Sequence, residues 1–157
     1  MKFLITKELT SNTLLGTLMS AVVIAIILYL ALDVLLHAYV IGLEPSVLMT
    51  TLYGNAETFE EPLLFDSLLL QVHIDLFMTL FALLILTSIY IRLYEKKTAT
   101  STLVHAVFIL ALGAPLFLIV AHFTSSFFAY LWLASFLLWH LFALFLSFKI
   151  LKKLFFK

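Results

Sequence analysis

The sequence contains no cysteine. This absence excludes disulfide bonds, thiolate metal sites, iron–sulfur clusters and haem attached covalently through cysteine. Binding sites made of imidazole and carboxylate groups are still compatible with the composition.

Charge is scarce as well, since only 11% of the 157 residues are charged and the formal net charge is zero. Such a balance gives no support for a nucleic-acid partner. The chain has no phosphate-binding loop, nucleophile elbow or HExxH motif, so a non-enzymatic role is expected. It also lacks the internal repeats that are typical of transporters.

Apolar residues are abundant instead, at 64% of the chain. A water-soluble domain of this length could not bury so much apolar surface, so the lipid bilayer is the expected solvent. Each span needs about 20 apolar residues. The sequence therefore predicts an all-α polytopic membrane protein, a single domain over 1–157 forming an antiparallel four-helix bundle, with spans at about 13–40, 63–91, 102–123 and 126–148.

Positive charge marks one side of the membrane. All nine basic residues precede the first span, follow the fourth or separate the second from the third: Lys2, Lys7, Arg92, Lys96, Lys97, Lys149, Lys152, Lys153 and Lys157. By the positive-inside rule both termini are cytoplasmic (N-in, C-in), in a bacterial-type inner membrane.

The outer loop, 41–62, is long enough for structure of its own. Glu44-Pro45-Ser46 is typical of a helix start, because proline suits the first helical position. Gly54-Asn55 is typical of a helix end. We therefore expect a short helix in this loop.

Polar residues inside the spans are the main indication of function, because ionisable groups within a bilayer are costly and face the bundle interior or water. The first span carries Asp33 and His37 four residues apart, hence on one face. The segment DSLLLQVHIDLF (66–77) begins the second span and adds Asp66, Ser67, Gln71, His73 and Asp75. We predict that this segment faces the bundle interior and meets Asp33 and His37.

The preferred interpretation is structural. The Asp and His side chains would then bond to one another and fix the packing of the first two spans. In function, this predicts a small accessory or structural subunit of a larger membrane complex, whose partners are other membrane subunits or further copies of the chain.

A b-type haem is the first alternative, because two imidazoles from different helices could ligate the iron from opposite sides. His105 and His140 lie at similar estimated depth in the inner halves of the third and fourth spans. An outer haem would use His73 with His37 or His122. In that case the chain would be an electron-transfer subunit.

A metal or proton site in the outer half is the second alternative. Its candidate residues are His37, His73, His122, Asp33 and Asp75, which are suitable ligand types for zinc, copper or iron. Staggered His and Asp residues also resemble a proton relay. No known ligand motif matches their spacing.

Overall fold

The computed structural model describes residues 13–94 and 98–155, and these residues are almost entirely helical. The five helices are α2 (Thr13–Val40), α3 (Pro45–Tyr53), α4 (Phe65–Leu93), α5 (Thr98–Phe123) and α6 (Ser126–Phe155). Four of them, all but α3, are long and apolar enough to cross a membrane. An all-α architecture with four apolar helices and a short helix in the first loop is therefore confirmed.

The helix bounds differ from the expected spans mainly at their polar ends. α5 begins at Thr98 rather than near 102, and α6 continues to Phe155 rather than ending near 148. The added turns contain polar threonine and lysine residues, and propagation of an already nucleated helix carries it through them. Hydrophobicity thus locates the span, and the helix itself extends beyond it.

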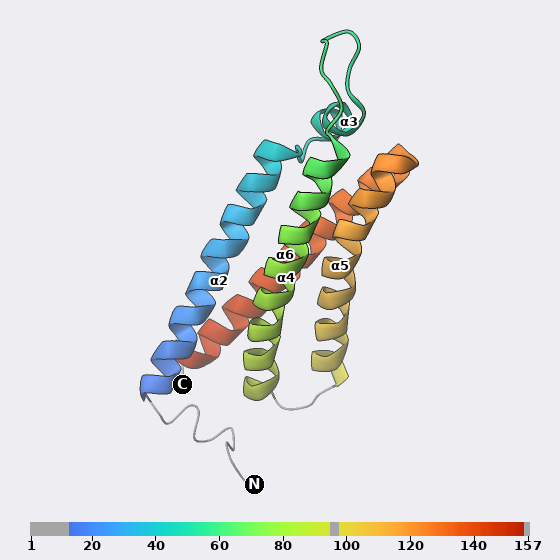
Figure 1. Cartoon of the computed structure of the whole chain (residues 1–157). Coiled ribbons are helices and arrows are strands. Elements are labelled where there is room, and N and C mark those ends of the chain that lie inside the picture. Colours follow the sequence, from blue (N-terminus) through green and yellow to red (C-terminus); the bar gives the residue numbers. More distant parts are fainter. Residues whose placement is uncertain (1–12, 95–97, 156–157) are drawn as a thin grey trace.

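The two ends of the molecule differ (Figure 1). Helix α3, the loop that follows it and the turn between α5 and α6 lie at one end, here named the α3 end. The start of α2, the end of α4 and the end of α6 lie at the opposite end. Of the basic residues, Lys2, Lys7, Lys96, Lys97 and Lys157 lie outside the described residues.

Helix α6 is the central element of the packing. It contacts α2, α3, α4 and α5, and its contact with α5 is the most extensive between any two elements. In Figure 1 it runs obliquely behind α2 and α4. Its buried face includes the large side chains Trp132, Phe136 and Trp139 together with the polar His140.

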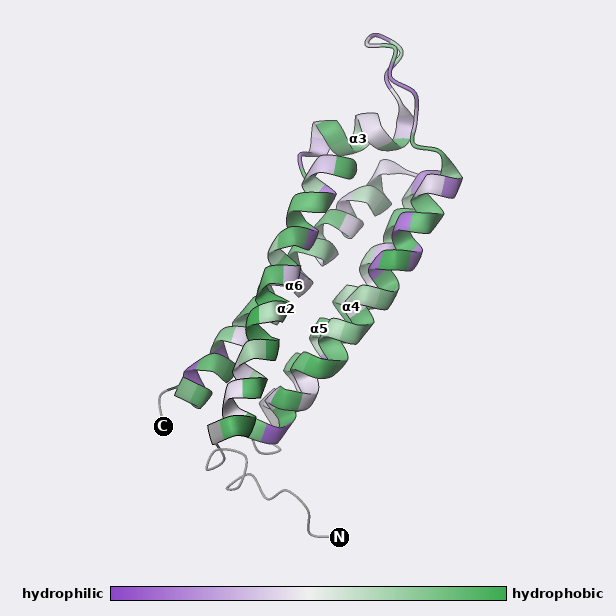
Figure 2. Ribbon diagram, turned by 60° about the vertical axis from the view of Figure 1, so that its left-hand side comes forward, coloured by the Kyte–Doolittle hydropathy of each residue, from purple (hydrophilic) through white to green (hydrophobic). Residues whose placement is uncertain are grey.

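Hydropathy is nearly uniform around the long helices. Figure 2 shows apolar residues along their whole length, with hydrophilic residues at the molecule's two ends and on the first turns of α4. Many large apolar side chains point outward, among them Leu28, Leu32, Phe81 and Phe148. An outer surface of this kind suits lipid or another apolar partner.

The loop helix α3 starts and stops where the sequence predicts. Glu44 is its N-cap, Pro45 occupies the first turn and Gly54 is its C-cap. Gly54 has a φ of 76°, and a Cβ there would lie 2.8 Å from the carbonyl oxygen of Glu60, so glycine is required at this position. The Tyr53 hydroxyl donates a 2.8 Å hydrogen bond to the carbonyl oxygen of Ala121 in α5, which joins α3 to the bundle.

Candidate functional site: a buried His/Asp network

His37, near the end of α2, connects two helices. Its Nδ1–H donates to the backbone carbonyl oxygen of Asp33 one turn earlier, at 2.9 Å. Its Nε2 lies 2.9 Å from Oδ2 of Asp75 in α4. The imidazole is buried, so both nitrogens have the partners that a buried polar ring requires.

His140 repeats this arrangement from α6. Its Nδ1–H donates to the backbone carbonyl oxygen of Phe136 at 2.8 Å, and its Nε2 lies 3.0 Å from Oδ2 of Asp33. Asp33 and His140 are only 8% and 3% exposed. We name Asp33, His37, Asp75 and His140 the His/Asp network; it joins α2, α4 and α6.

The proton count of the network follows from its hydrogen bonds. A carbonyl oxygen only accepts, so Nδ1 of each histidine carries hydrogen. Each Nε2 then faces a carboxylate, and that contact needs one shared proton, either on the nitrogen or on the oxygen. His37–Asp75 and His140–Asp33 are therefore each neutral as a pair, which a low-dielectric interior favours.

Gln71 extends the network toward the α3 end. Its amide Nε2–H donates to Oδ1 of Asp75 at 2.8 Å, one turn along α4. Asp75 thus accepts at one oxygen from Gln71 and meets His37 at the other. This fixes the carboxylate plane, because both of its oxygens are held from different directions.

Aromatic side chains of α6 enclose both imidazoles. The Phe136 ring centroid lies 4.5 Å from that of His37 and 4.3 Å from that of His140. The Trp139 ring lies 3.8 Å from that of His140 at a tilt of 39°, and the Trp132 ring lies 6.3 Å from that of His37. The two tryptophans of α6 therefore belong to the wall of the network, which restrains the orientations of the two imidazole rings.

A small cavity lies against the network. Its volume is about 20 Å³, and its polar wall is formed by Asp33, His37, Asp75 and Thr79. Small residues of α5 help to leave this space, namely Ala111, Ala114 and Pro115. A space of this size accommodates one water-sized guest and no organic substrate.

The segment DSLLLQVHIDLF faces the interior only in part, so the prediction for the whole segment is wrong. Gln71 and Asp75 reach the network, whereas Asp66, Ser67 and His73 are exposed. Two residues along a helix correspond to about 200°, so His73 and Asp75 must point to nearly opposite sides. Asp75 makes the expected contact, since it bonds to His37 and its carboxylate lies close to Asp33.

The remaining histidines of the sequence analysis lie apart from the network. His105 is exposed on α5, whereas His140 is buried. His122, at the end of α5, packs beside Phe65 and Phe123, and its buried Nδ1 has no hydrogen-bond partner among the described residues. Of the five candidates for a metal site, the structure brings together Asp33, His37 and Asp75.

His140 as a partner of Asp33 was missed by the sequence analysis. Counting residues from the membrane boundary places His140 deeper than Asp33, but α6 is oblique to α2 (Figure 1) and the two meet. One sequence pattern could have indicated this contact. Trp132, Phe136 and His140 follow one another at four-residue spacing, which places His140 on the aromatic face of α6.

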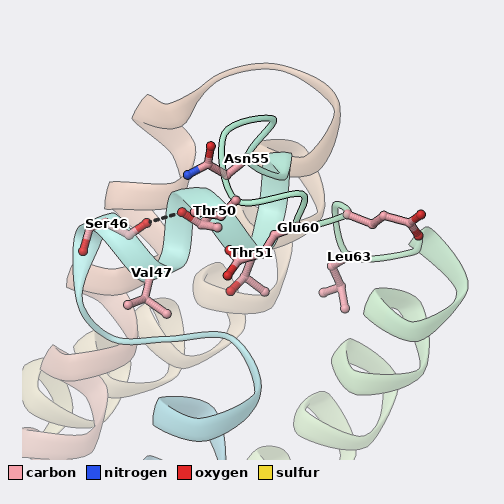
Figure 3. Close-up of a pocket in the computed structure, with 9 residues that line it drawn as sticks. Ser46, Val47, Thr50, Thr51, Asn55, Glu60 and Leu63 are labelled. Atoms are coloured by element: carbon pink, nitrogen blue, oxygen red, sulfur yellow. Dashed lines mark hydrogen bonds between the residues drawn. The ribbon is translucent and has the colours of Figure 1, made fainter.

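A second hollow, of about 560 Å³, lies between α3 and the loop that follows it. Figure 3 shows Thr50 and Ser46 of α3 joined by a hydrogen bond on one wall, with Asn55, Glu60 and Leu63 of the loop around it. Most of its lining residues carry a hydroxyl, amide or carboxylate group, and the hollow is open to water. In contrast to the His/Asp network, no set of imidazoles or opposed charges converges here.

No family model, curated protein or solved structure matches the chain.

Proposed function

We propose that the chain is an integral protein of a bacterial-type inner membrane, with four antiparallel spans and both termini in the cytoplasm. Arg92, Lys149, Lys152 and Lys153 lie at the end opposite α3 and support this orientation through the positive-inside rule. The α3 end, with Glu57, Glu60 and Glu61, would then face outward.

In this membrane the chain acts as a non-enzymatic accessory or structural subunit of a larger complex. The observation that carries this proposal is the closed interior. Polar groups of the network bond to one another, and the cavity beside them holds about 20 Å³, too little for an organic substrate. The network then locks three helices, and the apolar outer faces meet lipid, other subunits or a second copy.

A haem-binding role has less support from the geometry. Iron ligation by His140 would break its contact with Asp33, and the exposed His105 does not share a buried space with it. Ligation by His37 would likewise remove the imidazole partner of Asp75 and leave it only Gln71 within the described part of the chain, while His73 is exposed. Losing one partner of a buried pair is strongly destabilising.

A reduced-minus-oxidised optical spectrum, with native gel electrophoresis of the same mild-detergent extract, tests the proposal. We expect no b-type absorption bands and a particle larger than one chain, with partners or copies in fixed ratio. One or two haems per chain would overturn it in favour of an electron carrier. A colourless chain that migrates alone as a monomer would contradict the subunit role.

A further inference from the structure

Both network histidines are oriented as metal ligands usually are. A ligating histidine commonly donates one ring N–H to a backbone carbonyl or carboxylate, which aims the other nitrogen at the metal. Nδ1 of His37 and of His140 donate to the carbonyl oxygens of Asp33 and Phe136, so each Nε2 is aimed at a carboxylate. Phe136, between the two rings, keeps them in these positions.

Three of the four donor residues already lie close together, and His140 joins them through Asp33. One ligand atom each from Asp33, His37 and Asp75 lie within 4.8 Å of one another. The nearest nitrogen–oxygen distances are 2.9 Å for His37–Asp75 and 3.0 Å for His140–Asp33. In a tetrahedral zinc site, bonds of about 2.0 Å separate neighbouring ligands by roughly 3.3 Å. Asp33, His37 and Asp75 also line the adjoining cavity, which offers space for an ion between them.

The charges match a divalent cation. Two carboxylates and two imidazoles hold one shared proton in each pair, and the four side chains are neutral together. A divalent cation that enters displaces both protons, which leave to solvent, and the site is neutral again. Exchange therefore adds no net charge to the interior, where an unpaired ion would be costly.

A polar stripe of α4 provides a route from the α3 end. Ser67, Gln71 and Asp75 follow one another at four-residue spacing and hence on one face. Ser67 is exposed, Gln71 is half-buried and Asp75 is 15% exposed and bonded to His37. A hydrated cation reaching Asp75 first would meet His37, which contacts that carboxylate.

From these observations we propose that Asp33, His37, Asp75 and His140 bind one divalent transition-metal ion of the zinc class. Two imidazole nitrogens and two carboxylate oxygens suit zinc, manganese or ferrous iron, and the four-ligand set favours tetrahedral zinc. The ions that prefer oxygen alone, magnesium and calcium, fit this donor set poorly.

Titration calorimetry of the full chain in detergent, after chelator treatment, tests the proposal with zinc chloride as the probe. We expect one zinc per chain and an affinity at least tenfold weaker in Asp75→Asn and in His140→Gln. The matched controls are Asp66→Asn and His73→Gln, exposed residues of α4 that should leave the affinity unchanged. Absence of saturable binding, or equal loss in the control variants, would overturn the proposal.

X-ray absorption at the zinc edge provides a second measurement that does not depend on any variant folding. The wild-type protein with one equivalent of zinc should show four nitrogen or oxygen neighbours and the outer-shell scattering of two imidazoles. A six-coordinate spectrum without imidazole scattering would place the ion elsewhere and reject the site.

Discussion

At the scale of single residues, the His/Asp network shows how ionisable groups survive inside an apolar bundle. His37–Asp75 and His140–Asp33 are both neutral as pairs, and every polar ring nitrogen in them has a partner. Because removal of one member takes the proton-sharing partner from the other, each pair should behave as a unit.

A double-mutant cycle tests this unit. We expect His37→Leu and Asp75→Leu each to lower the free energy of unfolding by about 3 kcal/mol, because each leaves a buried polar partner unpaired. The double variant should lose less than the sum, with a coupling of about 1–3 kcal/mol. Unfolding in mixed micelles measures all three. Additive losses would show that the pair is not coupled. As a control, His73→Leu at an exposed position should change the free energy of unfolding little.

At the scale of elements, a tyrosine fastens the loop helix to the bundle. The carbonyl oxygens in the last turn of α5 have no partner within the helix. Tyr53 donates to one of them, that of Ala121. Burial raises the pKa of the Tyr53 hydroxyl above its ordinary value near 10, so the donor stays protonated over the physiological range.

This contact predicts an alkaline loosening of α3. A raised pKa in the folded state means that the contribution of Tyr53 is complete below the ordinary value and is lost as pH rises past the raised one. Hydrogen exchange of α3 amides should therefore show reduced protection above about pH 10 relative to the bundle. In the Tyr53→Phe variant, the α3 amides should already be less protected at neutral pH. Their protection should then show no additional drop near pH 10. Unchanged protection in Tyr53→Phe would argue against the link.

At the scale of the whole molecule, charge separates the two ends. The lysines that end α6 and Arg92 at the end of α4 lie together, and one of them, Lys153, donates to the carbonyl oxygen of Leu93 at the end of α4. Cations are favourable at helix C-termini, so this contact stabilises the end of α4 as well as marking the proposed cytoplasmic side.

Because the chain has no native cysteine, labelling can test the orientation without background. Thr58→Cys lies in the exposed loop at the α3 end, and Lys152→Cys is exposed at the opposite end. In intact spheroplasts, a membrane-impermeant maleimide should modify only Thr58→Cys; after permeabilisation it should modify both. Labelling of Lys152→Cys from outside would reverse the proposed topology.

The sequence by itself determined where helices form. Long apolar runs require helix in lipid, since every backbone polar group must be satisfied within the segment. Pro45 and Gly54 likewise set the two ends of α3 through their own backbone geometry, which depends on the local sequence alone. The four-residue spacing of Asp33 and His37 placed them on one face, as found.

Only the tertiary structure decided which polar side chains meet. The long helices are apolar on nearly all sides, so hydropathy does not distinguish the face toward the core from the face toward lipid (Figure 2). The rotation of α4 selects Asp75 over His73, and the oblique path of α6 brings His140 to Asp33. Rotation and tilt follow from packing against neighbouring helices, and that packing depends on residues far apart in the chain.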